Sequence, residues 1–65
     1  MNEDNKPKRW SVWRHKNGNL YEVLMYANVD SYREEYPETI IYRNFENQKV
    51  YCRKYSDWHR SMTKV

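Results

Sequence analysis

The chain has 65 residues, of which 38% are hydrophobic and 32% charged, and its formal net charge is +3. A chain of this length forms one small domain that buries about 60% of the surface of the unfolded chain, which excludes a two-domain enzyme or a large cofactor-binding fold. Only nine positions hold Ile, Leu or Val, but eleven hold aromatic residues. Each large ring can bury roughly 150–250 Å². We therefore expect a folded domain with an aromatic core.

The sequence lacks the patterns of several functional classes. No apolar stretch approaches the roughly 20 residues of a membrane helix, and residues 1–9 hold no apolar segment of a secretory signal, so we expect a cytoplasmic protein without membrane contact. Cys52 is the only cysteine, and His15 and His59 do not stand at metal-ligand spacing. A single glycine excludes a Gly-rich phosphate loop. No metal, cofactor or disulfide is expected.

The first elements predict a β-hairpin. The segment from 10 to 15 is aromatic and branched, as is typical of a strand, and residues 20–27 form the returning strand. Asn17-Gly18 between them favours a two-residue type I′ turn, which needs positive φ at both positions. This turn sets three pairs opposite one another on a nearly apolar face that we expect to be core: Arg14 with Tyr21, Val12 with Val23, and Trp10 with Met25. The other face carries Trp13, Leu20 and Leu24, so a homodimer through this second apolar face is also compatible with the sequence.

A polar, acidic loop over 28–38 leads to a second predicted hairpin, with strands over 39–43 and 49–54 and a turn centred on Asn47-Gln48. Two faces alternate along these strands, and a register slip of two residues leaves both unchanged. The face that we expect to be core holds Ile41, Phe45, Val50 and Cys52. Cys52 is therefore expected to be buried and unreactive. The opposite face holds Tyr42, Asn44, Tyr51 and Arg53.

The end of the domain predicts a short helical turn. Ser56 is expected to cap it, with Asp57 near its positive end and with Trp58 and Met62 on one side at positions i and i+4. Trp58 would close the core as a lid. The complete prediction is a mainly β fold, a small antiparallel barrel with a short C-terminal helical turn, over residues 10–62. Residues 1–9 form a disordered basic arm and residues 63–65 a tail.

Two blocks of the sequence resemble a family of short bacterial and phage domains of unknown function. Residues 13–24, Trp-Arg-His-Lys-Asn-Gly-Asn-Leu-Tyr-Glu-Val-Leu, are similar to its opening, an aromatic-Arg-His segment and a Lys-Gly turn before Tyr-Glu-Val-Leu. Its second block has a Val-Tyr-Arg strand, a Gly-containing turn, and aromatic-x-Arg-Pro before a closing aromatic. Here it is matched by residues 41–43, 51–53 and Trp58, with Gln48 in place of the turn glycine and Lys54 in place of the proline. The acidic loop is also longer than in the family.

The resemblance implies an SH3-like barrel and a phage or bacterial source, and hence the host cytoplasm for a phage protein. It assigns no activity and no catalytic residue.

Arginine and tyrosine side chains supply the candidate ligand-binding residues. Tyr42 and Arg53, with Tyr51 beside them, form the first predicted group, and Arg14 with Tyr21 the second. A tyrosine ring can stack on a base while a guanidinium binds a phosphate with two hydrogen bonds. The alternative is that the arginine stems cover a thin aromatic core.

These residues favour a non-enzymatic module that binds nucleic acid or a nucleotide. The alternative is a protein-interaction module, such as a phage factor that binds and inhibits a host protein, which small size and many tyrosines fit equally well. An enzyme is not expected, because no Ser, Cys or carboxylate stands at a spacing from His15 that implies a catalytic triad.

Overall fold

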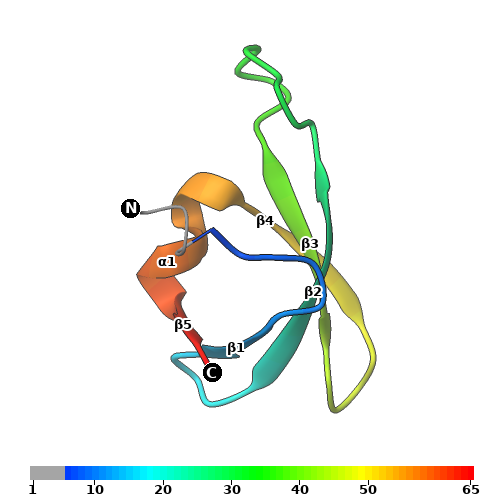
Figure 1. The fold of residues 1–65 in the computed structure, drawn as a ribbon, viewed down its shortest axis with the longest axis vertical. Helices are drawn as coiled ribbons and strands as arrows, with labels where there is room; N and C mark the ends of the chain where they lie inside the picture. Colours follow the sequence, from blue (N-terminus) through cyan, green and yellow to red (C-terminus); the bar gives the residue numbers. More distant parts are fainter. Residues whose placement is uncertain (1–5) are drawn as a thin grey trace.

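The computed structural model describes residues 6–65, which form a five-stranded antiparallel sheet and a short helical segment (Figure 1). The elements follow in the order β1 (Val12–His15), β2 (Leu20–Ala27), β3 (Thr39–Asn44), β4 (Val50–Lys54), the 3-10 turn η2 (Tyr55–Asp57), α1 (Trp58–Ser61) and β5 (Met62–Lys64). The strand order in the sheet is β4-β3-β2-β1-β5. The mainly β prediction is confirmed. The sheet is open, with β4 and β5 at its edges, so the structure does not show the closed barrel.

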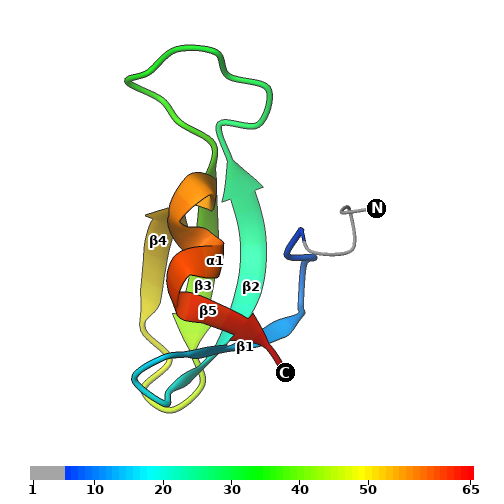
Figure 2. The same cartoon turned by 90° about the vertical axis from the view of Figure 1, so that its left-hand side faces the viewer.

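The sheet curves around the helical segment, which places the core on its concave face (Figures 1 and 2). Seven buried side chains form this core: Trp13, Tyr21, Val23, Ile40, Tyr42, Trp58 and Met62. The aromatic rings meet edge to face, the favourable geometry for their quadrupoles, with centroid distances of 5.7 Å for Trp58–Trp13 and 5.1 Å for Trp58–Tyr42. The expected aromatic core is therefore confirmed.

The first reverse turn lies where the sequence predicted it but has a different form. The His15 N–H donates to the Asn19 carbonyl at 2.9 Å, and the Gly18 N–H donates to the His15 carbonyl at 2.7 Å. In this turn Gly18 takes a positive φ of 98°, whereas Asn17 does not. The loop therefore has three residues and ends in a glycine bulge, so the two-residue type I′ prediction is wrong.

The extra loop residue shifts the hairpin register by one position. Trp13 lies opposite Tyr21 and Arg14 lies opposite Leu20, so the predicted Arg14–Tyr21 pair is wrong. Because side chains alternate along a strand, a slip of one residue turns the whole first strand over. Trp13 therefore lies in the core rather than on a second apolar face open to a homodimer. Two residues predicted to be core are instead exposed, namely Trp10 at 55% and Met25 at 48%.

The second hairpin keeps the two predicted faces, but the buried face is the other one. Its register differs from the prediction by two residues, with Tyr42 opposite Tyr51 and Ile41 opposite Cys52. Ile40 and Tyr42 are buried because their face packs against Trp58 from α1. The residues predicted to be core lie on the outer face, where Phe45, Val50 and Cys52 are exposed and Ile41 is half-buried. The prediction that Cys52 is buried is therefore wrong.

Asn44 organises the turn between β3 and β4. It is buried, and its Oδ1 accepts hydrogen bonds from the backbone N–H groups of Glu46 (2.6 Å) and Asn47 (3.1 Å). These bonds satisfy a polar group that would otherwise be costly to bury. Gln48 follows with a positive φ of 65°, and its N–H donates to the Asn44 carbonyl.

The end of the domain continues beyond the predicted helical turn. Trp58 and Met62 lie together in the core, as expected, but no side chain caps either helical segment, so the predicted Ser56 cap is wrong. β5 pairs with β1, setting His15 opposite Met62. This strand includes Thr63 and Lys64, which the sequence assigned to a tail.

The connection between β2 and β3 covers residues 28–38, as predicted. It projects from one end of the sheet, at the top of Figure 1. Asn28 and Asp30 take positive φ values of 59° and 69°, and the Asn28 side chain donates to the Pro37 carbonyl at 3.1 Å. This hydrogen bond ties the two ends of the loop together.

Candidate functional site

The predicted ligand-binding residues meet on the concave face, except for one. Tyr21 and Tyr42 have ring centroids 5.2 Å apart, and Tyr51 lies 6.0 Å from Tyr42 and 6.2 Å from Tyr21. Arg53 comes from the same strand and face as Tyr51 but lies opposite Ile40, so the predicted Tyr42–Arg53 cross-strand pair is wrong. Arg14 is exposed and lies next along β1 from the buried Trp13, so its side chain is on the other face.

Burial divides these residues into two groups. Tyr21 and Tyr42 are 9% and 6% exposed and belong to the core, so their rings are not open to a stacking base. Tyr51 is 41% exposed and Arg53 is half-buried. Among the described residues neither Arg14 nor Arg53 makes a cation–π contact. Tyr21 and Tyr42 therefore pack in the core, whereas Tyr51 and Arg53 remain accessible beside them.

A separate pocket lies at the segment that precedes β1. It has a volume of about 460 Å³ and is lined by Lys6, Lys8, Arg9, Trp10, Ser11, Trp13 and Lys64. Its volume falls within the roughly 300–1,000 Å³ of small-molecule sites. Four of the seven lining residues are cationic and none is acidic. We call these seven residues the basic pocket. Its lining favours an anionic ligand.

A tight turn positions Trp10, the exposed tryptophan of the basic pocket. The Ser11 N–H donates to the Lys8 carbonyl at 3.0 Å, and the Trp10 N–H donates to the Val23 carbonyl of β2 at 2.7 Å. Trp10 has a positive φ of 73°, which a bulky residue rarely adopts. The turn and the β2 contact hold the segment in this conformation. Trp10 therefore stays 55% exposed instead of continuing the strand.

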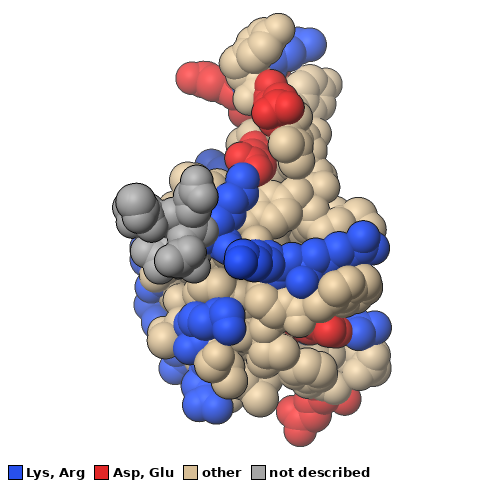
Figure 3. Space-filling model, in the orientation of Figure 1, with Lys and Arg blue, Asp and Glu red and all other residues tan. Residues whose placement is uncertain are grey.

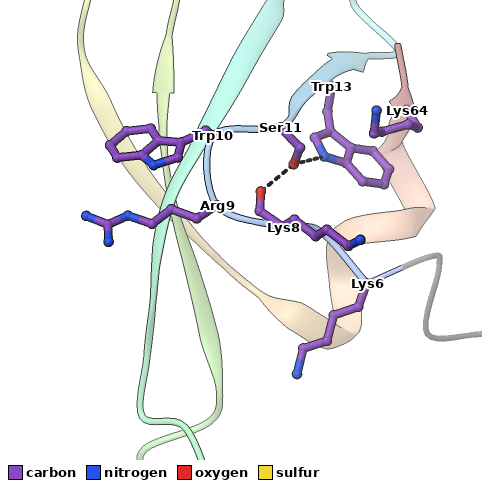
Figure 4. A pocket seen from close by; sticks show the side chains of 7 residues that line it. All are labelled: Lys6, Lys8, Arg9, Trp10, Ser11, Trp13 and Lys64. Atoms are coloured by element: carbon purple, nitrogen blue, oxygen red, sulfur yellow. Dashed lines mark hydrogen bonds between the residues drawn. The ribbon is translucent and has the colours of Figure 1, made fainter.

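The side chains of the basic pocket extend to both sides of this turn, with cations and one aromatic ring on each side (Figure 4). The side chains of Lys8, Trp13 and Lys64 extend to one side, whereas Arg9 and Trp10 extend to the other. The Arg9 guanidinium lies 4.7 Å from the Trp10 ring centroid, a cation–π contact. The Ser11 hydroxyl donates to the Lys8 carbonyl and accepts a 2.9 Å hydrogen bond from the Trp13 indole N–H. Ser11 thus joins the turn to the core.

The charges of the molecule are segregated. Figure 3 shows Lys and Arg side chains across the middle and lower left of one face, whereas Asp and Glu lie mainly on the loop that projects at the top. Within the basic pocket, Lys6 is partly neutralised by Glu38, 3.5 Å away. In the part of the chain that the structure describes, Lys8, Arg9 and Lys64 form no salt bridge. Lys64 Nζ donates a hydrogen bond to the Val65 carbonyl oxygen at 3.2 Å. Among the described residues, Lys8 and Arg9 are therefore the cations of the basic pocket that are most available to a ligand.

Tyr26 anchors the segment that carries the basic pocket. Its hydroxyl donates to the Pro7 carbonyl at 2.6 Å, and Pro7 is fully buried. Burial raises the pKa of Tyr26 above its ordinary value, and the neighbouring Tyr55 and Glu38 raise it further. Lys6 lies 5.1 Å from the Tyr26 ring centroid. Of the predicted disordered arm, residues 6–9 therefore pack on the domain, and residues 1–5 lie outside the described part.

The basic pocket was not predicted, because Trp10 was assigned to the first strand and residues 6–9 to the arm. The run Lys8-Arg9-Trp10 was the available signal, since cations next to an exposed ring are typical of nucleic-acid contacts. Within residues 6–65 no three His, Cys, Asp or Glu side chains gather in a way that could hold a metal ion. None of the described helices is long and apolar enough to cross a membrane.

No family model, no curated protein and no solved structure matches this chain. The chemistry of the site is therefore the basis for a functional assignment.

Proposed function

We propose that this protein is a non-enzymatic binding module for nucleic acid or a nucleotide, and that the basic pocket is its main contact. The observation that carries the proposal is the exposed Trp10 in contact with Arg9 on one side of the turn, with Lys8 and Lys64 on the other side (Figure 4). Lysine and arginine bind phosphates, and an exposed indole stacks on a base whatever its sequence.

The geometry favours a single strand over an isolated nucleotide. Trp10 and Lys8 point to opposite sides of the same turn (Figure 4), so one nucleotide cannot place its base on the first and its phosphate on the second. A strand that crosses the turn can contact both. A duplex fits less well, because its bases are already stacked on one another and cannot reach the indole.

Fluorescence titration with a short single-stranded oligonucleotide tests the proposal. Trp10 is the exposed tryptophan, whereas Trp13 and Trp58 are 4% and 0% exposed, so quenching reports on Trp10. We expect saturable quenching, with an affinity that falls steeply as salt is raised because counterions are released. Trp10→Ala should weaken binding by about tenfold or more, the value of one stacked base.

A matched pair of lysine variants controls for net charge. Lys8→Ala removes a cation of the basic pocket, and Lys49→Ala removes an exposed lysine from the turn between β3 and β4. Lys8→Ala should lower the slope of log affinity against log salt by about one, as expected for one lost phosphate contact, and Lys49→Ala should leave it unchanged. Equal effects of the two variants would contradict the assignment of the pocket, and no binding by the parent would contradict the function.

The second candidate is the protein-interaction module, for instance a phage factor that inhibits a host protein. It is favoured by three exposed apolar side chains on the outer face of the sheet: Met25, Phe45 and Val50.

We further propose that the fold is SH3-like and the source a phage or bacterium. The support for the fold is the curved antiparallel meander, followed by a helical turn and a fifth strand that pairs with the first. The support for the source is the resemblance of residues 13–24, 41–43 and 51–53 described above.

A further inference from the structure

His15 contacts Arg53 across the concave face, although two strands separate β1 from β4 in the sheet. The Arg53 Nη2 and the His15 Nε2 atoms are 3.4 Å apart. Both side chains are half-buried, and the His15 ring lies 6.3 Å from Tyr21, edge to face. The curvature of the sheet thus brings two nitrogen-bearing side chains together beside the exposed ring of Tyr51.

The hydrogen bond at Nδ1 determines which nitrogen of the neutral His15 ring carries the proton. The backbone N–H of Asn17 donates to His15 Nδ1 at 3.0 Å, and a backbone N–H can only donate. Nδ1 must therefore be unprotonated, so the proton of the neutral imidazole is on Nε2. A guanidinium nitrogen also only donates. The contact between Arg53 and His15 consequently joins two donors and is not a hydrogen bond.

Two donors this close are stabilised by an acceptor that receives both. Among the described residues no carboxylate pairs with Arg53, so this part of the chain supplies no such anion there. Arginine binds oxyanions with two parallel hydrogen bonds, and charge-assisted bonds of this kind are the strong ones. The oxygens of a tetrahedral phosphate point in several directions and can bind donors from two strands. The two oxygens of a carboxylate can both be occupied by the guanidinium alone.

We infer that His15 and Arg53 form a second binding site, which takes a phosphate group between the His15 Nε2–H and the Arg53 guanidinium. Tyr51, which is 41% exposed, borders it on β4. The site does not depend on the basic pocket, because it is built from different residues on a different part of the sheet. It gives the predicted Tyr51–Arg53 surface a ligand chemistry of its own.

Imidazole ¹H–¹⁵N correlation spectra test this site, with inorganic phosphate as the probe at constant pH and ionic strength. His15 and His59 are the two histidines, so His59 serves as an internal control. His15 should show the Nε2–H tautomer, and its Nε2 signal should shift saturably with phosphate while that of His59 stays still. An Nδ1–H tautomer would overturn the inference, because the contact with Arg53 would then be an ordinary hydrogen bond.

Variants at matched charge complete the test. Arg53→Ala should weaken phosphate binding at His15 by about tenfold or more, as expected for a lost hydrogen bond to a charged group. Arg53→Lys should weaken it less, since the charge remains but the two-pronged donor is lost. Arg60→Ala removes an exposed arginine elsewhere and should have no effect. Loss of binding in Arg60→Ala equal to that in Arg53→Ala would overturn the site.

Two further outcomes separate this site from others. Acetate that shifts the His15 signal at lower concentration than phosphate does would overturn the phosphate assignment. The Trp10 indole N–H reports independently on the basic pocket. If phosphate shifts that signal and leaves His15 unmoved, the inference fails while the proposed function stands.

Discussion

Trp10 combines two properties that each need an explanation at the scale of one residue. Its positive φ of 73° is unfavourable for a side chain with a Cβ atom, by about 1–2 kcal/mol, and its ring is more than half exposed, so burial does not offset that energy. Strained residues of this kind concentrate at binding sites, where the surrounding structure holds them. The hydrogen bond to Val23 and the turn at Lys8 hold this one.

Replacing Trp10 should therefore separate stability from binding. Glycine adopts positive φ freely, whereas alanine keeps the steric penalty. We expect Trp10→Gly to be more stable than Trp10→Ala by about 1 kcal/mol in urea denaturation, and both to lose oligonucleotide binding alike. If Trp10→Ala were the more stable of the two, the left-handed backbone at this position would be contradicted.

The raised pKa of Tyr26 predicts a loss of stability in alkali. The native state keeps the phenol proton at a pH where the unfolded chain, with a pKa of about 10, releases it. This contribution is fully present below about pH 10 and is lost as the pH rises further. Tyr26→Phe lacks the hydrogen bond to Pro7 and should be less stable at neutral pH, but the gap between the two proteins should narrow above about pH 10. Denaturation curves at several pH values measure this gap, and a constant gap would contradict the prediction.

At the scale of elements, the two hairpin turns meet the same backbone requirement with different residues. Each needs a residue of positive φ before the returning strand, and the first turn uses Gly18 whereas the second uses Gln48. A left-handed backbone is unfavourable for glutamine, because its Cβ approaches the following carbonyl oxygen. Gln48 thus stands at a position where glycine fits best.

Gln48→Gly should consequently stabilise the protein, by about 1 kcal/mol. The Gln48 side chain donates a 2.9 Å hydrogen bond to the Phe45 carbonyl. The glycine variant loses this bond, which reduces the gain in stability. Gly18→Ala is the opposite change at the first turn and should destabilise by about the same amount, although a Cβ there would meet no atom within 4 Å. Thermal denaturation of the two variants checks both signs.

The choice of the buried face is tested by two neighbouring isoleucines. Ile40 is fully buried in the core, whereas Ile41 is half-buried on the outer face. Removing one methyl group from a core isoleucine costs about 0.5–1.5 kcal/mol, so Ile40→Val should fall in this range and Ile41→Val clearly below it. A larger effect at Ile41 would support the face that the sequence predicted to be core.

The sequence allowed the number, order and alternation of the first four strands to be predicted, because Gly18 and the period of two are local signals. It did not allow the buried face to be predicted, because both faces of β3 carry apolar residues, Ile40 on one and Ile41 on the other. The deciding contact joins Tyr42 to Trp58, which lies 16 residues further along the chain, and contacts at that distance leave no local pattern. Arg53 and Tyr51 were placed together correctly, but His15 reaches Arg53 only through the curvature of the sheet.

At the scale of the whole molecule, the acidic residues of one loop lie away from the basic pocket, except for Glu38, which pairs with Lys6 at 3.5 Å. The loop over residues 28–38 carries Asp30, Glu34, Glu35 and Glu38, whereas the basic pocket contains no acidic residue. Such a separation lowers non-specific attraction to polyanions and orients a charged ligand as it approaches.

Neutralising the loop should therefore change the rate of association more than the contacts at the site. The double variant Glu34→Gln/Glu35→Gln removes two negative charges from the exposed loop, together with the 3.1 Å ion pair between Arg33 and Glu35, and should speed oligonucleotide association severalfold at low salt. The effect should disappear near 1 M salt, where the screening length falls to about 3 Å. Stopped-flow fluorescence of Trp10 measures the association rates of the parent and the variant. A difference that persists at high salt would contradict a long-range electrostatic effect of the loop.

The pairing of β5 with β1 has a consequence for the order of folding events. β1 to β4 form a meander whose turns are short, except for the loop over 28–38, whereas β5 meets β1 roughly 50 residues away along the chain. Because the pairing of β5 with β1 closes the longest stretch of chain in the sheet, we expect the meander to form first and β5 to dock late, after the rate-limiting barrier. Contacts that form after the rate-limiting barrier govern how fast a protein unfolds and not how fast it folds. We therefore expect the lifetime of the native state to depend chiefly on β5, which includes the buried Met62.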